Sequence, residues 1–517
     1  MIPKVSKNIF LLWRRLMNST NLVVVRLRLR DSPVRQYYDP SLPTIITQRH
    51  AILELAMQQK KNLIDIDLAL AADQSSVWHH LTNHTPYENA APMMIVEGHG
   101  MRVRDAKGNN YLDAASGGLW TVNVGYGRES IAKAVYEQLL KMNFYSQTAG
   151  NQPAALFAEK LISKMPGMSR VYYSNSGSEA NEKAYKIVRQ IAAKKYGGKK
   201  HKILFRERDY HGTTITALSS TGQFERKNQY GPFTPGFVEF PHCLEYRSQW
   251  GDIADYGVRA AMELERVILE QGPETVGAVV LEPITAGGGV ITPPSGYWKT
   301  IEEICKKYDV LIHIDEVVCG LGRTGKWFGY QHYGIKPDIV TMAKGVASGY
   351  AAISCTVTTE EVFDCFKTDG DDRDGYFRDV STFAGCTAGP AAALENIRII
   401  EDENLLDNVV TQGNYIKQRL LELKDRHSVI GDVRGKGLFV GLELVKDRIT
   451  KEPVEEALVM KIAAHCQNQS GVLIGRTNRS FREFNNTIAL SPALIATSAD
   501  IDEIVMALDK AFAALTG

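Results

Sequence analysis

The sequence predicts an α/β protein with a mainly parallel central sheet in a large domain and a smaller α+β domain built from both chain ends. Short apolar runs alternate with helical segments in the middle of the chain, whereas both flanks carry hairpin patterns. We expect the large domain at 126–390 and the small domain at 61–125 and 391–517. A chain of 517 residues is long enough to form two or more domains, each with its own hydrophobic core.

Five apolar runs predict the strands of the central sheet. They cover residues 170–174, 202–206, 276–284, 310–317 and 338–342. Continuous apolar runs separated by helices are typical of a parallel sheet that is covered on both faces. Ligands of such sheets bind at the carboxyl ends of the strands, so chemistry is expected where these runs end.

The flanking segments have a different pattern. Residues 94–114 alternate as two short strands around a turn at 107–110, and 128–142 has the apolar spacing of a helix. Near the other end, an amphipathic helix precedes a glycine-rich hairpin at about 430–445, and a last helix covers about 499–515. These elements predict the α+β domain.

The N-terminal 60 residues differ in composition from the rest. Residues 1–35 contain eight basic side chains and the single acid Asp31. An organellar transit peptide is one interpretation, but the alternation in VVVRLRLR is typical of a strand rather than an amphipathic helix. We favour a basic extension outside the catalytic fold and exclude residues 1–60 from the fold argument.

Composition narrows the class of protein and its location. The net charge is +1, so neither nucleic acid nor an acidic membrane is predicted as a partner. Seven scattered cysteines without a C-x-x-C spacing indicate reduced thiols in the cytoplasm, with no zinc site. No run of 18 apolar residues predicts a spanning helix.

A possible phosphate site follows the first run. Ser176, Gly177 and Ser178 begin an amphipathic helix, where free backbone N–H groups, hydroxyl groups and the positive dipole end favour an anion. An ordinary capping box between Ser176 and Glu179 is the alternative.

Three other strand ends carry candidate site residues. Tyr210 follows the second run and offers an aromatic face, although core packing would also explain it. Asp315 closes the fourth run, where a buried carboxylate needs a cation or a strong donor, and Val317 points to the same side. Lys344 follows the fifth run among small residues.

Together these residues predict a site for pyridoxal 5′-phosphate (PLP). A lysine binds the aldehyde of that cofactor, a carboxylate pairs with its ring nitrogen, and the anion site holds its phosphate. The formal G-x-G-x-x-G at 320–325 does not predict a dinucleotide site, because no helix pattern follows it.

With these residues in place, the chain resembles the class III PLP-dependent aminotransferases of fold type I from about residue 75 to its end. The resemblance rests on the segments NSGSEAN, DYHGTT, IHIDEVVCGLGRTGKWF, KPDIVTMAKG and STFAGCTAGPAA. It implies that Lys344 is the cofactor-binding lysine and proton shuttle, and that Asp315 is the partner of the ring nitrogen. The other cofactor contacts that it implies are Ser176, Gly177, Ser178, Tyr210, Glu282, Val317 and Thr382.

The resemblance also implies an assembly and a substrate class. In this family a threonine of the neighbouring subunit completes the phosphate site, and Thr382 matches it, so we expect a homodimer or homotetramer with active sites at the subunit interface. Gly287 stands where ornithine-type members keep an acid. Trp120 and Tyr145 match the substrate pocket of the branch that acts on ω-amino acids and amines.

Within that branch, FPHCLEYR and GVLIGRTNRSFREFNN resemble members that transfer the amino group of taurine to pyruvate. We therefore expect a ping-pong transaminase that gives sulfoacetaldehyde and L-alanine. The sulfonate needs a cation, for which Arg476 is the first candidate and Arg479 the second. A β-alanine, amine or diamine aminotransferase of the same class is the alternative, and a non-catalytic binding protein with this fold is the remote one.

Overall fold

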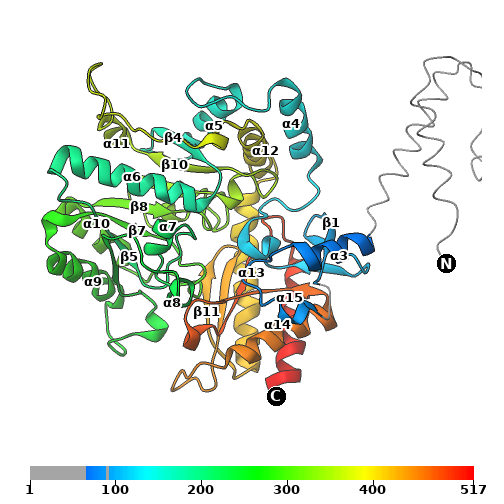
Figure 1. The fold of residues 1–517 in the computed structure, drawn as a ribbon. Coiled ribbons are helices and arrows are strands. Elements are labelled where there is room, and N and C mark those ends of the chain that lie inside the picture. The colour runs from blue at the N-terminus through cyan, green and yellow to red at the C-terminus, as the bar shows by residue number, and fades with distance from the viewer. Residues whose placement is uncertain (1–65, 89–91, 517) are drawn as a thin grey trace, which may run out of the picture. The chain divides into compact units, whose positions relative to one another are not determined.

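The computed structural model describes residues 66–88 and 92–516 (Figure 1). The predicted extension at 1–60 lies outside the described residues. The chain divides into two units, residues 1–92 and 93–517. In the first unit the structure describes helix α3 (Ile66–Ser76) and the short 3₁₀ helix η2 (Thr85–Glu88). The domain limits expected at residues 125 and 390 remain predictions.

A seven-stranded sheet forms the centre of the second unit, with the strand order β4-β10-β9-β8-β7-β5-β6. The strands are β4 (Arg170–Ser174), β5 (Lys202–Arg206), β6 (Phe237–Phe240), β7 (Val276–Leu281), β8 (Leu311–Asp315), β9 (Ile339–Met342) and β10 (Ser354–Thr358). Strand β10 is antiparallel to both its neighbours, and the other pairings are parallel. The five predicted runs are all strands of this sheet.

Helices cover both faces of the sheet (Figure 1). Ile203 and Phe205 of β5 pack with α6 (Gly177–Tyr196), whereas Leu204 belongs to the core shared with α9 (Tyr256–Gln271) and α10 (Tyr297–Tyr308). Successive side chains of a strand point to opposite faces, so a continuous apolar run satisfies both layers. This arrangement explains why the runs lack a polar face.

Two four-stranded sheets are formed by the flanks of this unit. One has the order β1-β2-β3-β13 and the other β11-β12-β15-β14. Their strands are β1 (Ile95–His99), β2 (Arg102–Asp105), β3 (Asn110–Asp113), β11 (Ile430–Lys436), β12 (Phe439–Leu444), β13 (Val472–Leu473), β14 (Gly475–Arg476) and β15 (Thr487–Leu490). The pairing of β3 with β13 joins early and late parts of the chain and confirms the predicted fold class.

The two short strands expected at 94–114 are three, because Gly100 takes a left-handed φ of +57° and adds a second turn. The remaining α-helices are α4 (Glu129–Lys141), α5 (Gln152–Ile162), α7 (Ile215–Ser219), α8 (Phe224–Lys227), α11 (Glu360–Asp364), α12 (Ala388–Asp402), α13 (Leu405–Arg426), α14 (Glu456–Ser470) and α15 (Ser498–Thr516). Of the helices in the described ranges, none is long and apolar enough to cross a membrane.

Helix α4 keeps much of its apolar face uncovered in the single chain. Ile131 is fully buried, but Leu139 and Leu140 are 45% and 71% exposed. Phe144 and Phe383 are exposed as well, and the isolated bridge between Phe144 and Cys386 brings their two loops together. An apolar surface of this kind marks an interaction site.

Candidate active site

A cavity of about 440 Å³ lies beyond the carboxyl ends of β4, β5, β8 and β9. It brings together seven of the predicted residues, which are Ser176, Gly177, Ser178, Tyr210, Asp315, Val317 and Lys344. Thr121 and Gly349, which come from turns, also line it. The position agrees with the rule that ligands of parallel sheets bind at the carboxyl ends of the strands.

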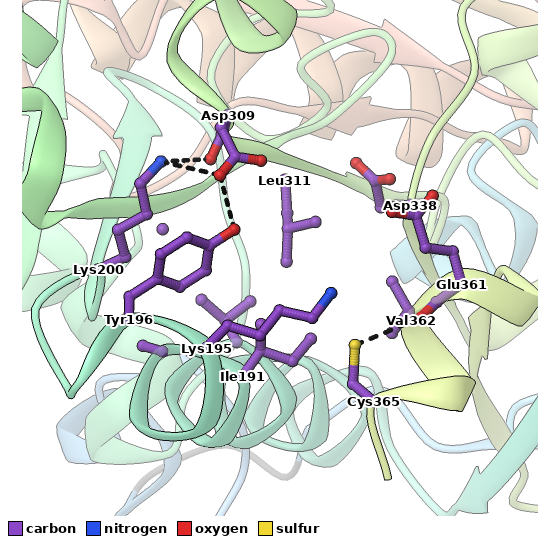
Figure 2. A pocket seen from close by; sticks show the side chains of 13 residues that line it. Ile191, Lys195, Tyr196, Lys200, Asp309, Leu311, Asp338, Glu361, Val362 and Cys365 are labelled. Atoms are coloured by element: carbon purple, nitrogen blue, oxygen red, sulfur yellow. Dashed lines mark hydrogen bonds and ion pairs between the residues drawn. The ribbon is translucent and has the colours of Figure 1, made fainter. Parts of the chain in front are cut away.

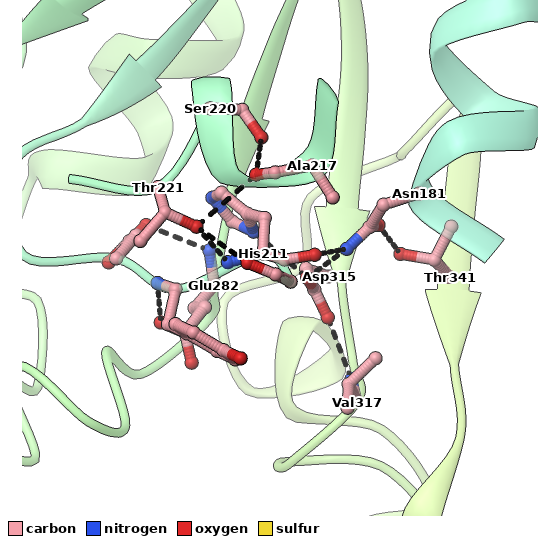
Figure 3. Close-up of polar contacts among 12 residues, drawn as sticks. Asn181, His211, Ala217, Ser220, Thr221, Glu282, Asp315, Val317 and Thr341 are labelled. Atoms are coloured by element: carbon pink, nitrogen blue, oxygen red, sulfur yellow. Dashed lines mark hydrogen bonds and ion pairs between the residues drawn. The ribbon is translucent and has the colours of Figure 1, made fainter. Parts of the chain in front are cut away.

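Asp315 is held ionised at the end of β8 by three hydrogen bonds (Figure 3). Its Oδ2 accepts from Asn181 Nδ2 at 2.8 Å and from His211 Nδ1 at 2.9 Å, and its Oδ1 accepts from the backbone N–H of Val317 at 3.0 Å. Burial acts to raise the pKa of Asp315, but these donors outweigh it and leave the pKa below its usual value. A buried carboxylate that keeps its charge is suited to pair with a protonated ring nitrogen.

The partners of Asp315 were not predicted as site residues. Asn181 lies on α6, where its Oδ1 accepts a hydrogen bond from Thr341 Oγ1 at 2.6 Å. His211 is buried, and its Nε2 has no hydrogen-bond partner among the described residues. Both follow a predicted site residue within the same quoted segment, NSGSEAN or DYHGTT. Their position in these two segments is the sequence feature that could have indicated a role in the site.

The first turn of α6 forms the predicted anion site. Ser176 Oγ accepts from the N–H of Glu179 at 3.2 Å, and the Glu179 carboxylate accepts from the N–H of Asn175 at 2.6 Å. Thus the capping alternative is also present. It leaves the N–H groups of Gly177 and Ser178 without a partner in the described part of the chain, so cap and anion site coexist.

Two glycines keep this region open. A Cβ on Gly177 would stand 2.9 Å from Val317 Cγ2, and one on Gly212 would stand 2.5 Å from Ser178 Oγ. Gly212 also has a φ of +143°, which side chains rarely adopt. The hydroxyl oxygen of Ser178 accepts from the N–H of Thr213 at 3.0 Å. Close approach of Val317, the α6 terminus and the Tyr210 loop therefore depends on glycine.

Lys344 begins the short 3₁₀ helix η7 (Lys344–Val346) directly after β9, with a φ of +45°. Burial lowers the pKa of its amine, although Asp315 and Glu282 act in the opposite direction. Its Nζ has no hydrogen-bond partner among the residues the structure describes. A strained backbone and a more readily neutral amine are properties expected of a nucleophile.

Glu282 follows β7 and accepts a hydrogen bond from the backbone of Tyr210. Its Oε1 accepts from the N–H of Tyr210 at 2.9 Å, and its Oε2 accepts from the N–H of Ala286 at 3.0 Å. Burial, together with Asp209 and Asp315, raises the pKa of Glu282 well above its usual value. The guanidinium of Arg226 lies 5.4 Å from the centre of the Tyr210 ring.

Glu282 and four further predicted residues do not line the cavity. Trp120 precedes Thr121 and meets the Phe439 ring edge-on, with centres 6.0 Å apart. Tyr145 is 53% exposed, and its N–H donates to the carbonyl of Gly385 at 3.2 Å. Thr382 is exposed on the same surface.

The fourth is Arg476 on β14. Arg476 Nη1 lies 3.0 Å from Glu456 Oε1, and the second candidate, Arg479, lies 3.9 Å from Glu456 Oε2. Both arginines therefore share one carboxylate. Arg226, in contrast, has no carboxylate within 4.0 Å among the described residues.

A smaller cavity of about 90 Å³ lies at the opposite ends of the strands (Figure 2). Its polar groups are partly engaged with one another, since Tyr196 donates to Asp309 Oδ2 at 2.6 Å and Lys200 donates to the carbonyl of Asp309 at 2.5 Å. It is too small for a ring-bearing cofactor and lies at the unfavourable end of the sheet. The larger cavity at the other end is the candidate active site.

The donor set of the larger cavity fits PLP. The α6 terminus offers unpaired N–H groups to a phosphate, Asp315 offers a charged carboxylate to a ring nitrogen, and Lys344 offers an amine to an aldehyde. Glycine at 177 and 212 leaves the space between these groups free of side chains. Fold and site therefore define a PLP-dependent enzyme of the α/β class.

Residues 84–512 match the family model described as Aminotransferase class-III, and the chain belongs to that family. Two relatives are similar over 86% of this chain. The hypotaurine/taurine–pyruvate aminotransferase of Paracoccus denitrificans (strain Pd 1222) is 65% identical with 97% of its length covered, and the taurine–pyruvate aminotransferase of Bilophila wadsworthia (strain 3_1_6) is 64% identical with 96% covered. Enzymes of this family depend on PLP.

A solved structure supports the fold. The crystal structure of an aminotransferase from Bacillus anthracis is 39% identical to this chain and superposes with a TM-score of 0.83. The superposition covers 87% of this chain and 99% of that one.

Proposed function

We propose that this protein transfers the amino group of taurine to pyruvate, giving sulfoacetaldehyde and L-alanine by a ping-pong mechanism. The observation that carries the proposal is the 65% identity to a relative named for hypotaurine or taurine and pyruvate, over 86% of this chain. The candidate site supports it, because Lys344, Asp315 and the α6 terminus are all in place.

When bound, PLP supplies the aldehyde that carries the amino group and the ring that accepts electrons. Asp315 keeps the ring nitrogen protonated, since its own pKa is held low. Tyr210 and Val317 line the cavity and would hold the cofactor ring, and Glu282 would support it through its hydrogen bond to the N–H of Tyr210. Lys344 Nζ takes the proton from the carbon that bears the donor's amino group and returns it to the cofactor side.

Arg476 is our first candidate for the sulfonate, with Arg479 second, and Trp120 and Tyr145 complete the donor pocket. Glu456 pairs with both arginines, so the donor's anion must compete with it for either one. Arg476→Gln is expected to raise KM for taurine about tenfold or more while leaving kcat for a neutral amine unchanged. Arg479→Gln and Arg226→Gln are the comparison variants.

The decisive experiment is an amine-donor panel with pyruvate as acceptor and alanine as the measured product. Taurine is expected to give the highest kcat/KM, above β-alanine and a diamine. Preference for β-alanine or a diamine would support the alternative activity within the class. No alanine above background with taurine would refute the assignment.

A second measurement separates an enzyme from a non-catalytic binding protein. The purified protein is expected to be yellow with bound cofactor, to lose that absorbance on addition of an amine donor, and to lack it in Lys344→Ala. A colourless protein that does not change with added PLP would contradict the cofactor assignment.

We also propose that the protein works as a homodimer or homotetramer in the cytoplasm, with active sites at the subunit interface. Thr382 would complete the phosphate site of the neighbouring subunit. Its exposure, together with the uncovered Leu139, Leu140 and Phe383, supports this assembly. The seven cysteines are free thiols, which suits a reducing compartment.

A further inference from the structure

A cavity of about 730 Å³ lies apart from the candidate active site. Its walls come from the segment after β5, from residues 242–256 after β6 and from Thr450, Lys451 and Phe484. It shares no lining residue with the active-site cavity in the described structure. The volume is in the usual range of small-molecule sites. Arg208, His242, Arg247, Tyr256, Lys451 and Phe484 are among its lining residues.

Arg208 is the most unusual of these side chains. It is 4% exposed, and its guanidinium makes no hydrogen bond and has no carboxylate within 4.0 Å in the described ranges. Aromatic rings lie over its guanidinium, with the ring centres of Phe484 and Phe481 at 4.5 Å and 5.4 Å. Burial lowers the pKa of Arg208 to about 10. Glu207 and Glu443 act to raise that pKa, whereas Arg434 and Arg247 act to lower it further.

A second set of donors faces the same space. Arg247 donates from Nε to Glu443, while its Nη2 is buried without a partner among the described residues. His242 accepts the N–H of Leu244 on Nδ1 at 3.1 Å, and its Nε2 lies 3.3 Å from Nε2 of Gln249. Burial and the surrounding arginines lower the pKa of His242 to about 2, so the ring is neutral. Arg208 Nε and Arg247 Nη2 are thus the buried N–H groups of this wall without a partner among the described residues.

In the described structure, the carboxylates of the cavity form no ion pair with Arg208, although Glu207 acts to raise its pKa. Glu245 and Asp252 are exposed, and Glu207 accepts the N–H of His242 at 3.3 Å. Glu443 is already shared between Arg247 and Arg434. A cationic ligand would face the guanidinium groups of the buried Arg208 and the partly buried Arg247, whereas an anion would supply the acceptors that they lack.

We propose that this cavity binds a small organic anion, whose carboxylate, sulfonate or phosphate oxygens accept hydrogen bonds from Arg208 and Arg247 while Tyr246, Tyr256 and Phe484 contact its carbon body. A planar guanidinium is suited to such oxyanions. The inference is independent of the donor proposed for the transaminase, because it rests on a different cavity.

Isothermal titration of the PLP-loaded enzyme with benzenesulfonate tests the site, because that probe combines an oxyanion with a ring. Saturable binding is expected, with benzenesulfonamide, its uncharged counterpart, at least about tenfold weaker. The affinities of benzoate and phenyl phosphate, measured in the same way, then show whether the site prefers a carboxylate, a phosphate or a sulfonate. No saturable binding of any of these anions, or equal binding of the sulfonamide, would overturn the proposal.

Substitutions test whether benzenesulfonate binds in this cavity. Arg208→Gln is expected to weaken benzenesulfonate at least about tenfold. The matched control Arg398→Gln removes an exposed arginine of α12 and should not change the affinity. Loss of binding in Arg476→Gln, with Arg208→Gln unaffected, would place the probe in the donor pocket and refute the assignment.

Thermal unfolding separates a ligand site from a structural arginine. Arg208→Gln leaves no carboxylate unpaired, so its Tm without ligand should not fall below that of wild type, and benzenesulfonate should raise only the wild-type Tm. A large loss of ligand-free Tm would mean that Arg208 is structural. If this variant does not fold, Arg247→Gln provides the same test, since Glu443 keeps Arg434 as partner.

Discussion

At the scale of single residues, the candidate site has opposite effects on the charge of two ionisable groups. It favours the charged form of Asp315 and the neutral form of Lys344. Hydrogen bonds keep the pKa of Asp315 low in spite of burial, whereas burial lowers the pKa of Lys344. One group therefore stays charged and the other loses its charge more easily than in water. The difference comes from hydrogen bonds: Asp315 accepts three, whereas Lys344 Nζ donates none among the described residues.

The role of His211 is open to test through pH. His211→Gln removes a donor that favours the ionised form of Asp315, so the pKa of that carboxyl should rise. We expect the acidic limb of the kcat/KM profile to move to higher pH while PLP stays bound. His201→Gln, which replaces an exposed histidine, is the control. An acidic limb at the wild-type pH would mean that His211 only packs.

Lys344 should weaken the fold of the cofactor-free protein. Its pKa is lowered in the folded state, so the folded protein bears the cost of a buried charge at low pH and sheds it as the pH rises towards the usual lysine value. The apoprotein of Lys344→Met is therefore expected to be more stable than wild type at pH 7, by about 1 kcal/mol or more. Urea unfolding at pH 7 and near pH 10 measures the effect, and a gain that does not shrink with pH would contradict this explanation.

At the scale of elements, the site depends on how closely α6 approaches β8. Helix α6 packs along one face of the sheet, and its first turn meets Val317, just beyond β8. Ser176 caps the helix while the next two N–H groups remain available. The first turn of α6 thus has two roles: Ser176 caps the helix, and the N–H groups of the next two residues form the anion site.

Gly177→Ala tests this approach. The added methyl would stand 2.9 Å from Val317 Cγ2, so either the helix start or the valine must move, and we expect PLP to bind about tenfold more weakly. Gly150→Ala is the control, because its Cβ would meet nothing within 4 Å. The double variant Gly177→Ala/Val317→Ala should recover most of the affinity. Without recovery, the loss would come from the helix itself.

At the scale of the whole molecule, the sequence predicts those parts whose signal is local. All five apolar runs are strands because a strand buried on both faces must be apolar throughout. Strands β6 and β10 were not predicted, since Phe237–Phe240 and Ser354–Thr358 mix polar and apolar residues. Strand β10, which is antiparallel to both its neighbours in the seven-stranded sheet, therefore had no signal in the sequence.

The same limit applies to the site. Lys344, Asp315 and the Ser176 turn stand at strand ends, where the sequence alone directs attention. Asn181 lies 134 positions from Asp315, and their contact depends on how α6 packs on the sheet. The large cavity around Arg208 had no signal either, because its walls come from segments that meet only in the folded chain.

The proposed subunit interface provides the last prediction. If Thr382 serves the neighbouring site, the Lys344→Ala and Thr382→Ala subunits should complement each other. A heterodimer of the two contains one site with both native residues, so it is expected to show about half of the wild-type activity at limiting PLP. Subunits with two different tags, expressed together and purified in sequence, isolate that species.

The matched control pairs Thr382→Ala with a Lys344→Ala/Thr382→Ala subunit, which leaves no site with both residues. Its activity should stay at the level of the Thr382→Ala sites that it contains. Equal activity of the two heterodimers would show that Thr382 acts within its own subunit or not at all. The exposed position of Thr382, outside the cavity of its own chain, favours complementation.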